Sequence, residues 1–378
     1  MQVRLTLRLS LVAALALPAF IRAGSWHLDP PILIHPTGTR PSLWHGTVAY
    51  LTDTGGSVMF FDGRDSAQLD PAAPHNYEPS NAGVVIAWRN SQSDEGTNEI
   101  LLWDGLAIHN VSNSPGIIDS DVSAASNGDV LWSREHEWLM YYDAATGTTA
   151  CLGLRGVRPS VYITPPGIVT YAYQDPDTFE VKYFDGTVTH TVGIGLADEG
   201  TALADLALWD GAVAWIGRGE GQIFDASELY FWKAGQTWRV TNDDSVGGVA
   251  DNYPSVWNDV VVWQRVVAAP LETRVFLWDG IDIVQLTTNR SLYPSFHDGQ
   301  LAWVDHADGL YLAGVVEELL GDCDANGTID ADDLLLLADC LTGPDGGAMR
   351  FLCACADFDA DGDVDLVDLA ALQTALGP

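Results

Sequence analysis

Two stretches near the C-terminus repeat oxygen-bearing side chains at the spacing of a calcium-binding loop. Loop positions 1, 3, 5, 7, 9 and 12 hold Asp322, Asp324, Asn326, Thr328, Asp330 and Asp333 in the first stretch, and Asp357, Asp359, Asp361, Asp363, Asp365 and Asp368 in the second. Gly327 and Gly362 stand at the sixth position, where such a loop turns sharply. Because Ca²⁺ favours several oxygen ligands, the spacing predicts two Ca²⁺ sites, with Thr328 and Asp363 binding through their backbone carbonyls.

Each predicted loop leads into a segment whose leucines are spaced for one buried helical face, so we expect helices at 332–341 and 366–376. Ile329 and Val364, at the eighth position of the two loops, fit the apolar pair that joins such loops. The two helices would position the loops, because each helix begins where its loop ends.

Cysteine usage fits an oxidising compartment, because disulfides compensate for the small core of a short module. Four of the five cysteines lie in this C-terminal segment, namely Cys323, Cys340, Cys353 and Cys355. A bridge between the last two is sterically poor, so we expect each of the first two to pair with one of them. Cys151 is left over, and we expect it to be buried.

The paired loops carry Asp rather than Glu at the twelfth position and lack a preceding helix, and in this they resemble a type I dockerin over residues 320–378. The resemblance implies a cohesin-domain protein as the partner. In that family the tenth and eleventh loop residues contact the cohesin, and here they are Ala331, Asp332, Leu366 and Val367. They depart from the Ser-Thr pair common in cellulosomal dockerins and differ between the two loops, which leaves the cohesin type open.

A second repeat runs from Pro41 to Leu312. Five units open with Pro-Ser, weaker ones begin near Asp119 and Asp205, and each continues through a turn into an apolar run that ends in an aromatic residue. The aromatic residues are spaced roughly 40 to 50 positions apart, the period of propeller blades. They are Tyr50, Trp88, Trp132, Tyr171, Trp215, Trp263 and Trp303. Residues fixed by a repeat are packing residues, and we assign that role to these side chains rather than carbohydrate stacking.

The second half of most units repeats a strand, an Asp-Gly pair and another strand, which indicates a hairpin. The seventh unit stops after 310–312 and lacks its last strand. The segment 32–35 has the composition to supply it, and such closure removes open sheet edges. The fold class expected is an all-β, seven-bladed β-propeller with N-terminal strand closure, followed by a small all-α calcium-binding module of paired EF-hand-like loops and helices.

This repeat resembles the TolB-like, WD40-like propellers, whose blades share the Pro-Ser opening, the Asp-Gly turn and a closing Leu-Thr such as Leu286-Thr287. Such motifs concern turns and packing and leave the ligand open. His45 and His297 precede turns at positions that we take as equivalent, which favours a structural role. The long loops between second and third strands offer binding candidates on one face, namely Arg89, Asp94, Glu95, Arg218 and Glu220.

Charge and targeting restrict the function. The formal net charge of −35 excludes nucleic acid and anionic membranes as partners, because both repel such a surface. Residues 1–23 combine Arg4 and Arg8 with a short apolar run typical of a cleaved secretion signal, and no later run is long enough to span a bilayer. We therefore expect a signal peptide at 1–23, a propeller at 24–314, a linker at 315–320 and a dockerin at 321–378, in a secreted or cell-surface protein.

Two classes of function remain. The first is a binding or scaffold component, attached to a cohesin-bearing partner and holding a polysaccharide or protein ligand on the propeller. The alternative is a polysaccharide-degrading lyase or glycoside hydrolase carried as dockerin cargo, which would need converging carboxylates or metal-bound histidines at the ring centre. His136-Glu137 lacks the second histidine of a zinc-protease motif, since that place is Met140, and the sequence contains no catalytic motif that we recognise. A periplasmic TolB relative is a third class, although that role needs no dockerin.

Overall fold

The computed structural model describes residues 25–52, 56–70, 75–83, 85–91, 97–195, 206–217, 227–242, 249–268, 271–306, 309–318, 333, 340–341, 355–356 and 364–375. The chain divides into two compact units. One is Trp26–Val316, and the other includes Glu317–Pro378. Within the described residues no helix is long and apolar enough to cross a membrane.

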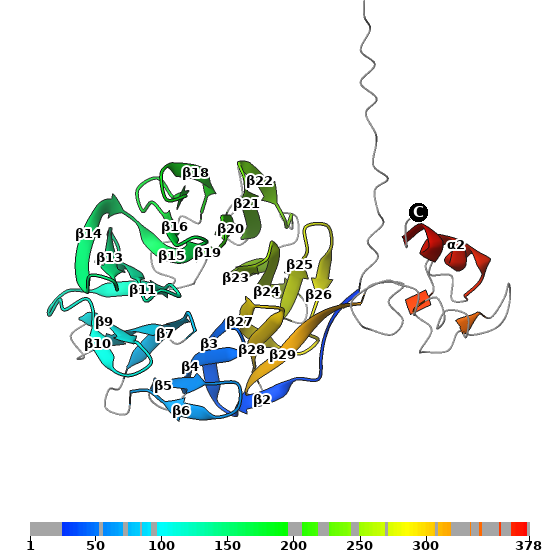
Figure 1. Cartoon of the computed structure of the whole chain (residues 1–378), viewed down its shortest axis with the longest axis horizontal. Helices are drawn as coiled ribbons and strands as arrows, with labels where there is room; N and C mark the ends of the chain where they lie inside the picture. The colour runs from blue at the N-terminus through cyan, green and yellow to red at the C-terminus, as the bar shows by residue number, and fades with distance from the viewer. Residues whose placement is uncertain are drawn as a thin grey trace, which may run out of the picture. The chain divides into compact units, whose positions relative to one another are not determined.

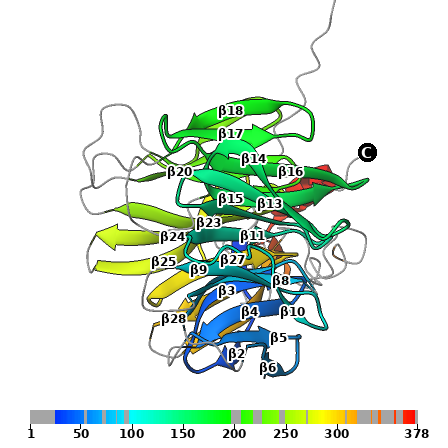
Figure 2. The same cartoon turned by 90° about the vertical axis from the view of Figure 1, so that its left-hand side faces the viewer.

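The larger unit is a ring of seven antiparallel sheets, which confirms the expected propeller (Figure 1). Each of the first six sheets consists of four consecutive strands. The first three sheets are β3 (Gly38–Trp44), β4 (Thr47–Thr52), β5 (Val58–Phe61) and β6 (Ser66–Gln68); β7 (Asn76–Asn81), β8 (Ile86–Ser91), β9 (Asn98–Trp103) and β10 (Ile108–Asn110); and β11 (Asp119–Ala124), β12 (Val130–Arg134), β13 (Trp138–Asp143) and β14 (Thr148–Arg155). The next three are β15 (Val157–Thr164), β16 (Ile168–Gln174), β17 (Glu180–Phe184) and β18 (Thr189–Ile194); β19 (Leu206–Trp209), β20 (Ala212–Gly217), β21 (Glu228–Lys233) and β22 (Gln236–Arg239); and β23 (Ala250–Trp257), β24 (Val260–Ala268), β25 (Leu271–Trp278) and β26 (Ile283–Gln285). The first strand of each blade lies nearest the axis of the ring, and in the turned view the strands of different blades lie roughly alongside one another (Figure 2).

The N-terminal segment completes the seventh blade, as predicted. This sheet holds β27 (Ser291–His297), β28 (Gln300–Asp305) and β29 (Gly309–Glu318). The strand β2 (Ile32–His35) pairs with β29 in antiparallel register, with Ile32 opposite Leu312. A second N-terminal strand that the sequence did not indicate, β1 (Ser25–Leu28), also pairs with β29. The ten residues of β29 provide enough edge for both short strands.

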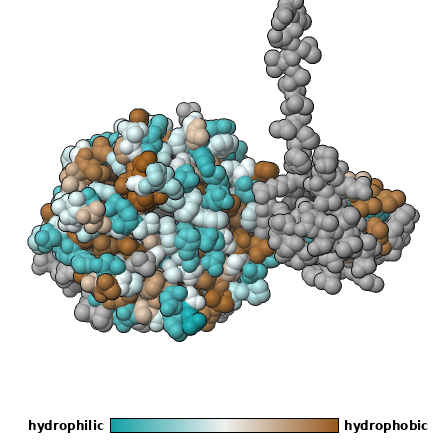
Figure 3. Space-filling model, viewed as in Figure 1, coloured by the Kyte–Doolittle hydropathy of each residue, from teal (hydrophilic) through white to brown (hydrophobic). Residues whose placement is uncertain are grey.

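The repeated aromatic residues form the core between blades, which confirms their packing role. All seven, from Tyr50 to Trp303, are at most 9% exposed. Trp263, for example, packs with Ala214 and Ile216 of the preceding blade. On the propeller face seen in Figure 3, hydrophobic and hydrophilic residues are interspersed rather than gathered into one patch. Burial of large apolar side chains between sheets therefore holds the ring together.

The Asp-Gly pairs form hairpins, as expected, but within four-residue loops rather than two-residue turns. Phe61 pairs with Ser66, and the Asp62 carboxylate accepts the backbone N–H groups of Arg64 and Asp65. Gly63 has φ of +97°, which only glycine adopts without strain. At Asp104 the same pattern of backbone donors, led by Ala107, lowers the carboxyl pKa to about 2.

The described part of the smaller unit contains helix α2 (Leu366–Ala375), close to the expected 366–376. Its start is capped reciprocally. Asp365 accepts the N–H of Val367 at 2.6 Å, and the Asp368 carboxylate accepts the N–H of Asp365 at 2.7 Å. The expected helix at 332–341 lies mostly outside the described residues, although Asp333 and Cys340 are helical.

Candidate functional site

Six blades carry the same distortion in their innermost strand. In each, a register shift leaves one residue before the Pro-Ser position, or before Val122-Ser123, with a positive φ between 49° and 54°. Such a conformation is uncommon for residues other than glycine, and a bulge re-aims the side chain at that point. The residues are Arg40, Glu78, Asp121, Arg158, Tyr253 and Tyr293. The bulges thus place charged and aromatic side chains at equivalent positions of six innermost strands.

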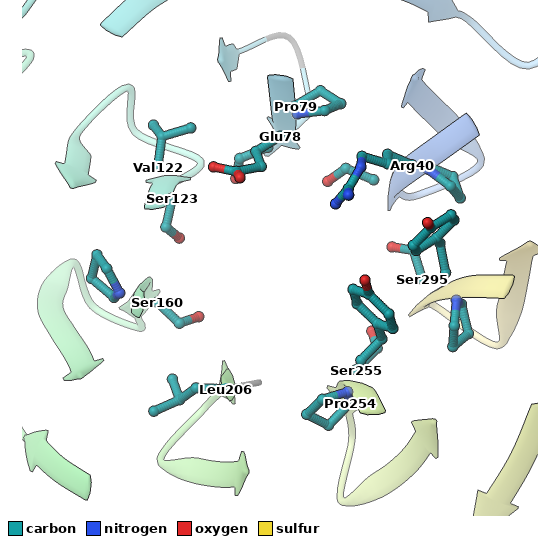
Figure 4. A pocket seen from close by; sticks show the side chains of 17 residues that line it. Arg40, Glu78, Pro79, Val122, Ser123, Ser160, Leu206, Pro254, Ser255 and Ser295 are labelled. Atoms are coloured by element: carbon teal, nitrogen blue, oxygen red, sulfur yellow. The ribbon is translucent and has the colours of Figure 1, made fainter. Parts of the chain in front are cut away.

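A central cavity of about 260 Å³ lies along this axis (Figure 4). Arg40, Glu78, Tyr253 and Tyr293 line it together with the Pro-Ser residues of the blades. Five of the serine hydroxyls also join neighbouring blades, since each of the five accepts a backbone N–H of the next innermost strand. The donor and acceptor pairs are Leu43 to Ser295, Asn81 to Ser42, Ala124 to Ser80, Val161 to Ser123 and Phe296 to Ser255, at 2.9–3.0 Å.

Glu78 and Arg89 form an ion pair beside the cavity. Their charged atoms lie 3.3 Å apart, and both side chains are mostly buried. The guanidinium of Arg89 also stacks on Tyr77 at 4.6 Å. Burial raises the pKa of the Glu78 carboxyl, and the nearby charge of Asp121 adds to this, while Arg89 opposes it. Arg89 is therefore a strand residue of β8 and not the loop residue that we expected, because β8 continues to Ser91.

A second cluster joins cation and aromatic groups. The guanidinium of Arg40 stacks over the ring of Tyr293 at 5.0 Å, and Tyr253 meets Tyr293 edge to face at 4.9 Å. In Figure 4, the side chains of Arg40 and Glu78 both project into the cavity. Sequence reasoning missed these residues because it searched for what the repeat conserves, and the position before Pro-Ser varies. The variable position next to the constant Pro-Ser pair was the sequence signal that could have indicated these residues.

A group of aromatic rings meets at the centre of the propeller. Most of them stand three residues after the Pro of their blade in the sequence. Rings from the first, fourth, fifth, sixth and seventh blades meet there. They are Trp44, Tyr162, Trp209, Trp257 and His297, with centroid distances of 4.3 Å from Trp44 to His297 and 5.9 Å from Trp44 to Trp209 across the ring. We name this group the aromatic plug. It makes the cavity accessible from one end of the axis.

The two histidines are not equivalent, in contrast to our expectation. His297 pairs with Gln300 just as Trp44 pairs with Thr47, so His297 corresponds to Trp44 and lies in the plug. His45 lies one residue further, in the turn, where its Nδ1 is 2.8 Å from Asp298. The structural role predicted for His297 is nevertheless consistent with its burial among aromatic rings.

Stability of the propeller should depend on pH through His297. Its ring is 4% exposed, and its Nδ1 accepts the N–H of His45, so a proton there would break that bond. Burial first, and the charge of His45 second, lower the pKa of His297 to about 4. The unfolded histidine binds a proton near pH 6.5, so stability is full above that pH and falls as the pH drops toward 4.

We expect this effect to cost about 2.5 kcal/mol by pH 4.5. The variant His297→Asn keeps an acceptor near Nδ1 and cannot titrate. Urea unfolding at pH 7 and pH 4.5, followed by tryptophan fluorescence, should show a smaller loss for the variant than for the wild-type protein. Equal losses in the two proteins would contradict the assignment.

In the smaller unit, Asp333, Asp365 and Asp368 are the described members of the expected calcium ligands. Asp333 and Asp368, at the twelfth position of their loops, are 0% and 1% exposed, and Val364 at the eighth position is fully buried. Buried carboxylates require charge partners or a metal, so their placement fits the predicted sites. The other nine expected ligands lie outside the described residues. Among the described residues no group of three or more His, Cys, Asp or Glu side chains is arranged to hold a metal.

The start of α2 exposes two apolar side chains. Leu366 is 72% and Val367 56% exposed, whereas Asp368 turns inward. The residues at the same positions of the first loop, Ala331 and Asp332, lie outside the described residues.

Residues 320–377 match the family described as the Dockerin type I domain.

The chain is a seven-bladed β-propeller joined to a type I dockerin. Dockerins of this type bind calcium generally, and the domain implies assembly with a cohesin partner. No curated protein matches the chain.

Solved structures similar to the chain are propellers. The β-propeller domain of the Trilobed protease from Pyrococcus furiosus is 11% identical, with a TM-score of 0.55, covering 79% of this chain and 99% of that chain. Acylaminoacyl peptidase from Pyrococcus horikoshii is 10% identical, with a TM-score of 0.52, over 79% of this chain and 53% of that chain. Oligogalacturonate lyase from Vibrio parahaemolyticus is 10% identical, with a TM-score of 0.50, over 77% and 96%. At these identities the likeness concerns the fold alone.

Cysteines divide between the two units. Cys340 and Cys355 of the dockerin are disulfide-bonded, and the other two cysteines of the expected bridges, Cys323 and Cys353, lie outside the described residues. Cys151 is a free, exposed thiol, so our expectation of burial was wrong. It lies on β14, the outermost strand of its blade, where the side chains are largely exposed.

Of the five loop candidates, only Arg89 falls within the described part of the propeller. The other four, Asp94, Glu95, Arg218 and Glu220, lie outside it. The propeller site that can be built from described residues is therefore the central cavity, with its ring of bulge residues and its aromatic plug.

Proposed function

We propose that this chain is a secreted propeller anchored through its calcium-dependent dockerin to a cohesin-bearing partner, where it acts as a binding or scaffold component. The exposed pair Leu366 and Val367 carries this proposal. Apolar side chains at a helix start, held outward while Asp368 is buried beneath them, are suited to anchor a partner. The central cavity supplies the second binding site.

Two calcium ions would occupy the dockerin, held by the twelve oxygen-bearing residues from Asp322 to Asp368. The buried Asp333 and Asp368 support this, since both are helical carboxylates at the twelfth position of their expected loops. Calcium would neutralise the Asp series and fix the helix starts that contact the cohesin. In our proposal Ala331 and Asp332 form the corresponding contact of the first loop.

Secretion is supported by two features. The signal-like segment 1–23 precedes the propeller in the sequence, and it lies outside the described residues. The disulfide-bonded Cys340 and Cys355 fit an oxidising compartment. A secreted or cell-surface location follows from the proposal.

The test is calcium titration and cohesin capture by the full-length protein. Isothermal titration should show two calcium sites, and immobilised type I cohesins should capture the protein in calcium but not after chelation. The variant Asp333→Asn with Asp368→Asn should lose both, while Asp177→Asn, on an exposed turn of the propeller, should retain both. One calcium site, or capture that survives chelation, would refute the proposal.

A second candidate is a polysaccharide-degrading lyase or glycoside hydrolase. It is favoured by Glu78, whose raised carboxyl pKa at the cavity suits a general acid. A glycan array probed with the full-length protein, beside an assay of reducing-sugar release, separates the two functions. Sugar release that disappears in Glu78→Gln would establish the enzyme, and binding without release would establish the binding component.

A further inference from the structure

The guanidinium of Arg40 faces the cavity without a protein acceptor. It is held by stacking on Tyr293, and within the described residues it donates no hydrogen bond. Arginine presents a planar set of donors that matches a carboxylate in two-point contact. Stacking fixes the orientation of this set in advance, which lowers the entropy lost when an anion binds.

Glu78 offers the complementary group across the same cavity. Its Oε1 pairs with Arg89, whereas its Oε2 is buried and has no hydrogen-bond partner in the described structure. Buried polar atoms without partners are rare in native proteins. A ligand that satisfies both groups needs an anionic acceptor for Arg40 and a hydrogen-bond donor for Glu78.

The charge around the cavity favours an anion. Of the two charged side chains that line the cavity, Glu78 is already paired with Arg89, whereas Arg40 forms no ion pair within the described residues, so one positive charge remains in excess. This local excess of positive charge occurs in a protein whose formal net charge is −35. A zwitterionic ligand would leave the excess uncompensated, whereas a hydroxylated monoacid would neutralise it.

The shape of the cavity limits the size of the ligand. At about 260 Å³ it is smaller than the ~300–1,000 Å³ sites of drug-sized ligands. The aromatic plug closes one end, so a polymer cannot pass through the ring. The serine hydroxyls and tyrosine rings that line the walls suit a polar ring such as a sugar. Only the terminal unit of a longer chain fits.

We propose that the propeller cavity binds the terminal uronate of an acidic oligosaccharide, with its carboxylate on Arg40 and a ring hydroxyl donating to Oε2 of Glu78. This inference rests on the proposed role of the propeller as a binding component. It is separable from that role, because the propeller can hold another ligand if this one fails.

The test uses the full-length protein in calcium and isothermal titration with three probes. They are a galacturonate disaccharide, its methyl ester, and a short acidic peptide with a free carboxyl terminus. The free acid should bind at least about 10-fold more tightly than the neutral ester, since a hydrogen bond to a charged group is worth about that factor. The peptide should bind more weakly than the free acid.

Arg40→Gln should weaken binding of the free acid by about 10- to 100-fold and leave binding of the ester unchanged. Arg64→Gln, which removes an exposed arginine from a blade turn, is the matched control and should bind as the wild-type protein does. Tryptophan fluorescence checks that each variant is folded. Equal affinity for acid and ester, preference for the peptide, absence of uronate binding, or an unaffected Arg40→Gln would overturn the inference. Glycan-array binding with no uronate preference would overturn it alone and leave the proposed function standing.

Discussion

Replacing Leu366 and Val367 together by Asp is expected to abolish cohesin capture while calcium binding remains. Both side chains are more than half exposed, and neither supplies a ligand oxygen in the proposed sites. Apolar anchors at the centre of an interface cost about 2 kcal/mol or more each when they are lost, so capture should weaken by about 1,000-fold. Two new carboxylates beside Asp365 and Asp368 should weaken it further.

The measurement is capture on immobilised type I cohesins, with calcium titration on the same variant. A matched control places the same change on the propeller, as Val188→Asp with Ile281→Asp, since these residues are 55% and 65% exposed. The control should be captured normally. If the dockerin variant is captured as well, the interface lies elsewhere; if it loses calcium, the pair belongs to the core of the module.

Replacing Asp251 by Ala should destabilise the propeller by about 3–5 kcal/mol, because it breaks a buried ion pair by removing one partner. The Asp251 carboxylate is 0% exposed and accepts both Nε and one terminal nitrogen of Arg265, at 2.8 and 3.1 Å. It also accepts Nε1 of Trp263 at 2.8 Å and the hydroxyl of Thr241 at 2.7 Å. One carboxylate thus joins two strands of the sixth blade, β23 and β24, to the segment that follows β22 in the fifth blade.

Urea unfolding followed by tryptophan fluorescence measures this loss, because all 14 tryptophans lie in the propeller sequence, from Trp26 to Trp303. The control is Asp259→Ala, which removes an exposed carboxylate paired with Lys233. An exposed pair is worth less than about 1 kcal/mol, so the control should unfold nearly as the wild-type protein does. A loss at Asp251 no larger than that of the control would show that the buried network contributes no stability.

The architecture could be read from the sequence because each blade is a local pattern that recurs. Strand, turn and aromatic residue fall within one unit, and burial of Trp88 and its counterparts follows from the repeat. The missing last strand of the seventh unit even indicated β2, since a closed ring leaves no free edge. The calcium pattern is equally local, because one short loop specifies its ligands by spacing alone.

The cavity could not be read in this way. Its members come from different blades, so Arg40 and Tyr293 meet only because the ring closes and brings the first blade beside the last. Their positive φ arises from the bulge of each innermost strand, and the residue before Pro-Ser differs from blade to blade. A comparison of the repeats gives no weight to a position that varies between them, although the fold places this residue near the axis.

Smaller differences have the same origin. The register of the hairpins, and not the order of turn residues, makes His297 the counterpart of Trp44. Arg89 became a buried strand residue because β8 extends into the expected loop, and Cys151 is exposed because the outermost strand has a neighbour on one side only. The sequence by itself determined the repeat, the closure of the ring and the calcium-ligand pattern, because these depend on neighbours along the chain. Only the tertiary structure decided which side chains face the cavity, because that depends on contacts between blades roughly 40 residues apart.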